Sequence, residues 1–478
     1  MPVPMPTPIA RAAALLLGAA LCTAAPVRAQ SNAELLQELK ALRDRVGSLE
    51  SRLKAAEAAE AAKPAQAEWG MTPQQVQDFN RIAVKTEGLE DAVEAQGLKM
   101  LKISGFMDPT WLYNQRQNRA GFQFLNPVAL DGYNYDNSYF GSATIDFQKE
   151  MEGGTRWRLT LVPNRGTGSV ITEQSIVQEA SVSLPLGDLQ TRLIAGQIPD
   201  WSGYEYQQAT LNKLITHNLL YDFTLPTLYT GVGMEYSRGK WLSKWMLANV
   251  NASKRNAGEK APALVYRVDY SKGEFEGFGF AGLHGKLVNY NECGTGTCAD
   301  SRADLFEADA YFIRGDLTWQ GQASVGRQKR AAIVPDPTTG DLRDARWWGL
   351  STLLAYKFIP RWEAIGRLDY VNNAKNGGGL LTYTGYFDSA AGIGGDYRNG
   401  IGIDPTLDCL TDKAGAGCSK GTNRVALSLG MSYLYNLNTS FKAELRLDQA
   451  NLPVFQDIRT GDYRKSNTVF GTSVVVSF

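Results

Sequence analysis

Histidine is almost absent from this chain: His217 and His284 are the only two among 478 residues. Two imidazoles leave little for His-based acid–base catalysis or for a metal site. No serine stands in the strand–turn–helix setting of a nucleophile elbow. The acidic residues within 131–136 and 336–344 lack the ordered ligand spacing of a calcium loop. The sequence therefore predicts no enzyme, no cofactor and no metal.

The chain also lacks an excess of charge of either sign. It has 49 basic and 49 acidic residues, whereas a nucleic-acid partner would favour a basic surface. After Leu21 no apolar run reaches the about 20 residues that a membrane helix needs. That absence does not make the chain soluble, because a transmembrane strand needs only about 10 residues with every second one apolar.

The first 29 residues have the pattern of a secretory signal peptide. Arg11 is followed by the apolar run 12–21, and Val27-Arg28-Ala29 forms a small-residue cleavage site. The mature protein is expected to begin near Gln30, in an oxidising compartment.

Cysteines are few, and four of the five follow the expected cleavage site. Their even number and compartment favour disulfides. We predict two local bonds, Cys293–Cys298 and Cys409–Cys418, each within a Gly-rich stretch. The alternative is a four-thiolate metal site, but the pairs lack the usual zinc spacings.

Residues 30–63 are predicted to form a coiled-coil arm, and residues 64–98 a helical connector in the periplasm. Apolar residues recur at heptad spacing, and Arg45-Val46-Gly47-Ser48-Leu49-Glu50 resembles a trimer-favouring pattern in which Arg45 reaches Glu50 of a neighbouring chain. The alternative is a helix that only spaces the barrel from the cell wall. The predicted coiled-coil residues are Leu35, Leu39, Leu42, Arg45, Val46, Leu49, Glu50 and Leu53.

Residues 99–478 are predicted to form an all-β, 16-stranded antiparallel transmembrane β-barrel. Several segments alternate apolar with charged residues, as strands between lipid and water do. A soluble sandwich explains one such face equally well, but it does not explain the loops, which alternate short and long. The short turns lie at 151–154, 187, 239–240, 274, 315, 359–360 and 437. The long loops lie at 108–137, 164–174, 199–228, 251–261, 290–302, 331–342, 374–421 and 451–464.

The chain ends on an aromatic residue in an alternating segment. Phe470, Val474, Val476 and Phe478 share one face. This resembles the signal that the barrel assembly machinery of the outer membrane reads, the alternative being an ordinary core strand.

The charged positions of the alternating segments are expected to face the lumen. Seven basic residues stand against six acidic ones, which indicates a general pore with opposed charges more than an anion filter. The alternative is that these charges merely solvate a wet lumen and pair across strands. The predicted pore-lining residues are Arg156, Arg158, Glu235, Arg267, Asp269, Arg361, Glu363, Arg367, Asp369, Lys442, Glu444, Arg446 and Asp448.

The segment Gly196-Gln197-Ile198-Pro199, with Trp201 after it, resembles a motif of the phosphate-selective (O/P-type) porins of Gram-negative outer membranes. The resemblance implies a trimeric 16-stranded channel that is narrowed by its third long loop. The residues expected there are Asp200, Trp201, Glu205, Lys213, His217 and Asp222. They could form a sliding surface for solutes or the packing core of the loop itself.

Two function classes remain. The first is a homotrimeric outer-membrane porin, embedded in lipid, that passes small hydrophilic solutes, with phosphate among the possible anions. The second is a non-conducting structural or adhesive barrel whose arm tethers it in the periplasm. Gly277-Phe278-Gly279-Phe280-Ala281-Gly282 matches the dinucleotide fingerprint, but it lies in an alternating strand with no helix after it.

Overall fold

The computed structural model describes two compact units, residues 1–99 and 100–478. Within them it describes residues 40, 43–55, 72–95, 97–124, 133, 140–162, 176–250, 262–294, 297–377, 400–407 and 417–478. The predicted signal peptide lies outside these residues. Among the described residues, no helix is both long and apolar enough to span a membrane.

The described residues of the first unit include a helix over residues 43–55 and α3 over Pro73–Ala95. In the first helix, Val46 is exposed while Leu49 and Leu53 are half-buried. Arg45 and Glu50 lie on the same helix. Leu35, Leu39 and Leu42 fall outside the described residues, so the coiled coil stays a prediction.

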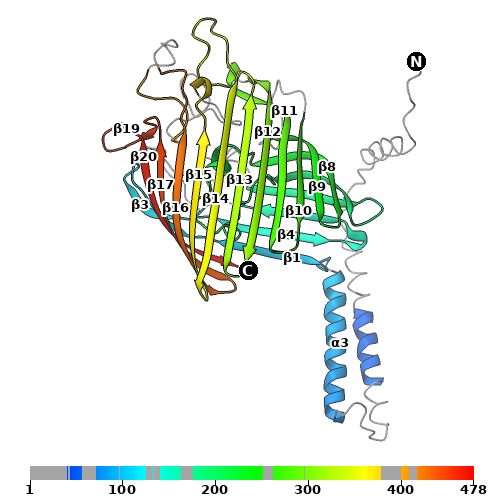
Figure 1. Ribbon diagram of the computed structural model, residues 1–478. Coiled ribbons are helices and arrows are strands. Elements are labelled where there is room, and N and C mark those ends of the chain that lie inside the picture. Colours follow the sequence, from blue (N-terminus) through cyan, green and yellow to red (C-terminus); the bar gives the residue numbers. More distant parts are fainter. Residues whose placement is uncertain are drawn as a thin grey trace, which may run out of the picture. The chain divides into compact units, whose positions relative to one another are not determined.

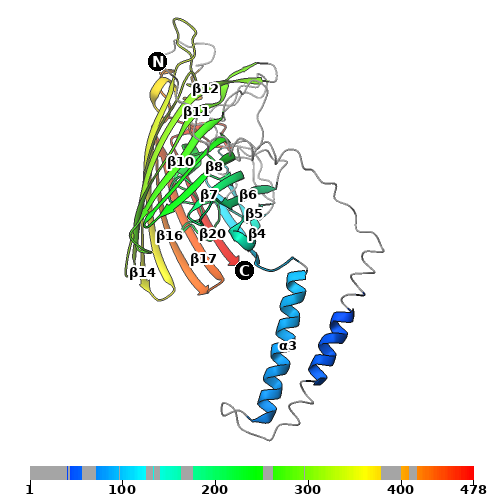
Figure 2. The same cartoon turned by 90° about the vertical axis from the view of Figure 1, so that its right-hand side faces the viewer.

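The second unit is a closed antiparallel barrel (Figures 1 and 2). Its wall has sixteen strand positions, which are called staves, and some of them contain more than one labelled strand. The first stave is formed by β1 and β2 together, and β20 pairs with both of them to close the sheet. β3 extends the second stave, and β18 and β19 form a small separate hairpin. The strands are β1 (Leu101–Met107), β2 (Thr110–Asn114), β3 (Arg119–Gln123), β4 (Ala143–Glu150), β5 (Arg156–Leu161), β6 (Val177–Pro185), β7 (Thr191–Pro199), β8 (Leu228–Arg238), β9 (Trp241–Val250), β10 (Ala263–Ser271), β11 (Glu276–Gly294), β12 (Thr297–Arg314), β13 (Leu317–Gln328), β14 (Ala345–Ile359), β15 (Trp362–Asn372), β16 (Arg424–Asn436), β17 (Thr439–Ala450), β18 (Phe455–Gln456), β19 (Tyr463–Arg464) and β20 (Ser466–Ser477).

Alternation of side chains builds the wall as the sequence predicts. In β14, Trp347, Ser351 and Leu353 are buried inside, while Trp348 and Leu350 are exposed outside. Successive side chains of a strand point to opposite faces. The barrel therefore has an apolar outer surface and an inner surface on which most of the buried charges lie.

The short and long connections segregate to opposite ends of the barrel (Figure 1). All seven predicted short turns are present. The predicted long loops at 199–228, 331–342 and 451–464 are also present. Those at 164–174 and 251–261 lie outside the described residues, and those at 108–137 and 374–421 are described only in part. The exception is the connection at 290–302. There β11 continues to Gly294 and β12 begins at Thr297, with Cys293 opposite Cys298. The Gly-rich stretch is the tip of a long hairpin, because the strand ladder continues past the rim.

The last strand closes the barrel in the face pattern that the sequence predicts. Phe470 and Val476 of β20 are exposed, while the residues that precede them, Val469 and Val475, are buried. The backbone of Phe478 exchanges two hydrogen bonds with Gly105 of β1, at 3.0 and 3.1 Å. A Cβ on Gly105 would lie 2.4 Å from the carbonyl oxygen of Thr144. Only glycine fits there without displacing the strand pairing at the closure of the barrel.

Candidate functional site: the third loop and the lumen

The third long loop, residues 200–227, crosses the lumen. It leaves β7, the fifth stave, and contacts β15, the thirteenth, which lies halfway round the barrel. The Tyr204 hydroxyl lies 2.6 Å from Ser351 Oγ on β14, and Lys213 pairs with Glu363 of β15 at 2.7 Å. The loop also contains the short helix α4 (Leu219–Phe223), which Asn218 caps by accepting from the Tyr221 amide.

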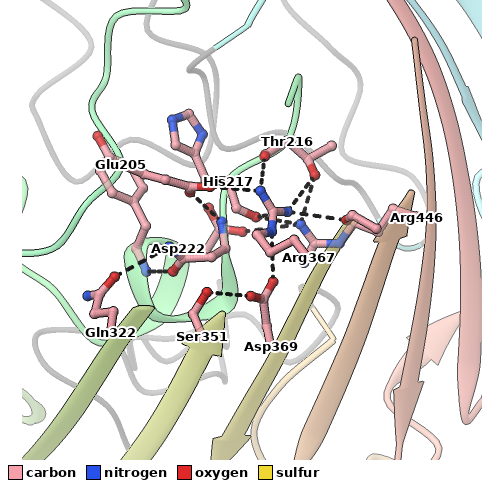
Figure 3. A network of polar contacts seen from close by, with 12 residues as sticks. Glu205, Thr216, His217, Asp222, Gln322, Ser351, Arg367, Asp369 and Arg446 are labelled. Atoms are coloured by element: carbon pink, nitrogen blue, oxygen red, sulfur yellow. Dashed lines mark hydrogen bonds and ion pairs between the residues drawn. The ribbon is translucent and has the colours of Figure 1, made fainter. Parts of the chain in front are cut away.

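Arg367 is the centre of the anchor that holds this loop (Figure 3). Its guanidinium is buried and donates to the carbonyl oxygens of Thr216 at 2.6 Å and His217 at 2.9 Å. It also pairs with Glu205 of the loop at 2.8 Å and with Asp369 of its own strand at 3.1 Å. A planar fork of five donors is suited to this task.

Strand β17 adds three more attachments to the same loop. Glu444 accepts from the backbone amides of Ile215 at 2.8 Å and Thr216 at 2.7 Å. Arg446 donates to the His217 carbonyl at 2.6 Å, and Lys442 donates to the Asn212 carbonyl at 2.5 Å. The loop therefore satisfies its backbone carbonyls and amides with charged side chains of the wall, as buried polar groups require.

Apolar packing holds the rest of the loop. Leu219 and Leu220 of α4 are fully buried in a cluster that includes Met246, Leu283 and Trp347 of the wall. Gly430 of β16 faces inward and leaves room for Leu214 of the loop, because a Cβ on Gly430 would lie 2.2 Å from Leu214 Cδ2.

Burial in the loop shifts the ionisation of its own groups. It raises the pKa of Asp222 to about 7 and that of Asp200 to about 6, and it raises the pKa of Glu205 as well. Burial also lowers the pKa of His217 to about 3, so its ring is neutral and stacks on Tyr221 at 4.3 Å. Desolvation of the charged form is the largest cause in each case.

The open part of the lumen lies on the opposite wall. A cavity of about 1250 Å³ extends from the short-turn end, where Lys240 and Gly273 line it, to Trp201, Tyr204 and Tyr206 of the loop. A second cavity of about 540 Å³ adjoins it and shares Arg158, Lys244 and Trp201 in its lining.

Ion pairs line this cavity. Arg158 pairs with Asp146 at 2.8 Å and with Glu179 at 3.3 Å. Arg267 pairs with Asp309 at 2.6 Å and with Asp269 at 2.7 Å. Glu235 and Lys244 form a third pair at 3.2 Å.

The structure divides the predicted pore-lining residues into two groups. Arg156, Arg158, Glu235, Arg267 and Asp269 line the two cavities. Seven others lie elsewhere. Glu363 pairs with Lys213. The other six are buried, and they or the residues next to them hold the third loop: Arg367, Asp369, Lys442, Glu444, Arg446 and Asp448.

Arg361 is placed differently from the sequence expectation. It lies in the turn between β14 and β15 with a φ of 73°, and its side chain is exposed. The turn consists of Pro360 and Arg361, one position later than the sequence suggests, so Arg361 does not reach the lumen.

The predicted loop residues are also divided. Asp200 and Trp201 line the main cavity, whereas Glu205 and His217 are buried in the anchor and Asp222 lies beside Arg446 at 3.9 Å. The loop is thus both a boundary of the cavity and a packed body of its own.

Six charged residues of the main cavity were not predicted from the sequence. Lys240 and Lys272 lie in the turns after β8 and β10, and the other four lie on strands: Asp146, Glu179, Lys244 and Asp309. Each of these four occupies an inward position of an alternating strand, so parity could have identified them. Gly279 also faces the lumen and leaves room for a charged side chain, because a Cβ there would lie 2.5 Å from the Arg267 guanidinium. In the apparent dinucleotide fingerprint, Gly277, Gly279 and Ala281 face the lumen, whereas Phe278 and Phe280 are exposed on the outer face.

The cysteines are only partly described. Cys418 is buried, and its predicted partner Cys409 lies outside the described residues. The side chains of Cys293 and Cys298 are likewise outside them. Both pairings stay predictions.

No group of three or more metal-ligating side chains occurs within the described part of the chain. Residues 417–421 spell Gly-Cys-Ser-Lys-Gly, but a strand, β16, follows them rather than a helix. The required setting of a nucleophile elbow is therefore missing there.

Comparison with known proteins gives a family and a set of distant structures. A family model described as "Protein of unknown function (DUF3138)" matches residues 12–478. No curated protein matches the chain.

The solved structures that resemble it are outer-membrane proteins. OmpT of Vibrio cholerae, folded in vitro, is 10% identical over 79% of this chain and 97% of that one, with a TM-score of 0.48. An anion-selective porin from Comamonas acidovorans is 10% identical over 79% and 99%, also with a TM-score of 0.48. The outer membrane channel DcaP of Acinetobacter baumannii is 11% identical over 79% and 97%, with a TM-score of 0.44. These similarities are low, and nothing below rests on them.

Proposed function

The chain belongs to the DUF3138 family of proteins of unknown function, whose description names no activity, and we propose from the geometry of the barrel that it is an outer-membrane porin. It would let small hydrophilic solutes diffuse passively, without a cofactor. The observation that carries this proposal is a closed barrel with an apolar exterior and a charged cavity of about 1250 Å³ inside.

The exterior supports a membrane location. Trp348, Leu350, Leu354 and Phe358 of β14 are all exposed on one face. Ten residues separate Trp348 from Phe358, which is about 33 Å along the strand and about 25 Å in height at a tilt of about 40°. That height matches the apolar band of outer-membrane barrels. Such a surface would be a liability in water.

The charges of the cavity support a general pore. Its lining contains five acidic and five basic residues, so it favours neither anions nor cations strongly. The phosphate preference implied by the family resemblance gains no support from this count. The five acidic residues are Asp146, Glu179, Asp200, Asp269 and Asp309, and the five basic ones are Arg158, Lys240, Lys244, Arg267 and Lys272.

The remaining features complete the proposal. Residues 1–29 would direct export, and the exposed Phe478 would present the terminal strand to the barrel assembly machinery. The helix over 43–55 would form part of a periplasmic coiled coil, since Leu49 and Leu53 are spaced for one seam. The protein would then be a homotrimer in the outer membrane of a Gram-negative bacterium, with Cys293–Cys298 and Cys409–Cys418 as disulfides.

Single-channel recording tests the proposal. The mature protein is inserted into planar bilayers under a KCl gradient, beside a variant in which residues 205–217 are replaced by a short Gly-Ser linker. We expect stable steps that group in threes, a reversal potential near zero, and larger steps in the variant. A folded wild-type protein that never conducts would contradict the porin proposal.

One observation favours the second candidate, a non-conducting structural barrel. The main cavity ends at Trp201, Tyr204 and Tyr206, and α4 packs against the wall beyond them. A plugged barrel predicts no conductance from the wild type and new conductance once residues 205–217 are removed. The same recording therefore separates the two functions.

A further inference from the structure

Strands β11 to β14 have a basic cluster on the outside of the barrel, near the long-loop end. Neighbouring residues in the ladder form a row, in which His284 is opposite Asp304, Asp304 opposite Arg327, and Arg327 opposite Arg346. Lys286 is opposite Arg302 in the next row. These side chains point outward, because the residues that alternate with them are buried.

One carboxylate holds this cluster together. Asp304 pairs with Arg327 at 3.0 Å, with Arg302 at 3.3 Å and with His284 Nδ1 at 3.1 Å. Four permanently basic side chains, which include Lys286 and Arg346, thus stand beside Asp304 in these two rows. Asp300 lies in the next row of β12, and Asp344, which is close to Arg346, pairs with Lys329 at 2.7 Å. The Arg302 side chain is 65% exposed and that of Arg327 is 43% exposed. The cluster keeps a net positive charge and accessible guanidinium groups.

An apolar groove lies below the cluster on the same strands, and one row of exposed side chains, Phe306, Val325 and Trp348, separates the two. It has a volume of about 650 Å³, and small residues form its floor: Ala308 and Ala310 on β12, and Gly321 and Ala323 on β13. Asp304 is four to six residues from Ala308 and Ala310, or about 13–20 Å along the strand.

Larger side chains form the sides of this groove. Phe278 and Phe280 line one side, and Leu350 lines the other. The indole of Trp319 is fixed by a hydrogen bond from Nε1 to Thr352 Oγ1 at 2.9 Å. The groove consists of two neighbouring ladder rows that extend across β11 to β15, within the apolar outer surface.

We propose that this face is a binding site for a phosphate-bearing lipid of the membrane leaflet at the long-loop end. The phosphate would lie between Arg302 and Arg327, and an acyl chain would lie in the groove beside Ala308 and Ala323. Arginine binds phosphate through two parallel hydrogen bonds. An unneutralised basic cluster at the edge of the hydrocarbon region would be costly, and a lipid phosphate removes that cost. The inference rests on the proposed membrane location.

Native mass spectrometry of the full mature protein with diphosphoryl lipid A as the probe tests the site. The variant R302Q/R327Q removes two charges from the cluster. Its matched control is R238Q/R314Q, which removes two charges from the outer face at the short-turn end. A323F fills the groove, and A364F places the same ring elsewhere on the outer face. Single-channel conductance is recorded for every variant.

We expect R302Q/R327Q and A323F to bind lipid A at least roughly tenfold more weakly than wild type, and both controls to bind normally. Dephosphorylated lipid A should bind weakly to all of them. Equal binding by variants and controls would overturn the site, as would loss of the trimer with lipid binding unchanged, which would make this face a protein interface. Competition by inorganic phosphate at the same concentration as lipid A would show an anion site and also overturn it. Unchanged conductance alongside lost lipid binding would sink only this inference, whereas lipid binding without conductance would sink only the porin proposal.

Discussion

Both carboxylate oxygens of Glu444 accept hydrogen bonds from Thr216. One bond comes from the Thr216 amide at 2.7 Å and the other from its hydroxyl at 2.5 Å. The two residues are 228 positions apart in the sequence. The bond joins a wall strand to the third loop, and it shows that Glu444 of β17 holds the loop and does not face open water.

Release of the third loop is therefore the expected result of Arg367→Gln. Removing one partner of a buried ion pair costs about 3–5 kcal/mol, because the other charge stays buried and unpaired. Glu205 and Asp369 would lose their common cation. Lys213 is the only lysine or arginine in residues 200–227, so trypsin cleavage at Lys213 in the folded protein measures the release.

Arg361→Gln is the matched control, since Arg361 is exposed in the turn that precedes the same strand. It should leave Lys213 resistant to trypsin. Resistance of the Arg367→Gln variant, in a protein that still folds, would show that the anchor does not depend on Arg367.

Ion preference is expected to change in Arg267→Gln. This residue neutralises Asp269 and Asp309 in the cavity wall. One unbalanced charge at about 4 Å in water is worth about 1 kcal/mol, or roughly a fivefold change in the ratio of cation to anion permeability. The reversal potential under a KCl gradient measures this ratio, and we expect it to move toward cations.

Arg238→Gln removes the same charge from the outside of the barrel and should not move the reversal potential. If Arg267→Gln and Arg238→Gln give the same value as wild type, ions do not pass along this wall.

The barrel wall could be predicted from sequence because its pattern is local. The alternation of Trp347 with Trp348, or of Glu444 with Leu445, is visible within a few residues and fixes both the strand and its faces. The hairpin tip at Cys293 was missed because its glycines indicate a loop, while the pairing that extends the strands is a property of two segments together.

The lumen could be predicted only in part, for the same reason. The alternation of inward and outward side chains along a strand places Arg367 and Glu444 inside, but it does not indicate that Thr216 and His217 lie against them. Such contacts depend on how a long loop folds back across the barrel. The loop and the inward charges are therefore predictable from the sequence, whereas the six anchor residues are indistinguishable there from residues that line the pore.

Gly430→Val tests the packing of the loop independently of charge. A Cβ at this position would lie 2.2 Å from Leu214 Cδ2 and 3.2 Å from the Ala443 carbonyl oxygen. Overpacking of this kind costs about 1–3 kcal/mol. We expect faster tryptic cleavage at Lys213 and a lower unfolding temperature.

Gly366→Val is its control on the adjacent strand, because the nearest atom to a Cβ there is 4.0 Å away. Valine suits a strand at both positions. Equal cleavage rates in the two variants would argue that the contact of Leu214 with the wall does not help to hold the loop.

Acid pH should stabilise the packing of the third loop against the barrel wall through Asp222. Burial raises the pKa of this carboxyl from 3.8 to about 7, so the folded protein holds a proton that the unfolded chain releases. This contribution to stability is fully present below about pH 4 and is lost as the pH rises through about 7. Three pKa units at about 1.36 kcal/mol each set an upper bound of about 4 kcal/mol.

Asp222→Asn cannot ionise, and it should therefore remove this part of the pH dependence. We expect the wild-type unfolding temperature to fall between pH 5 and pH 8, and the fall to be smaller in the variant. Asp336→Asn, in an exposed loop where backbone hydrogen bonds from Thr338 and Thr339 lower the pKa of the carboxyl, should keep the wild-type difference. An identical fall in all three proteins would show that Asp222 stays charged in the folded barrel, with Arg446, 3.9 Å away, compensating for its burial.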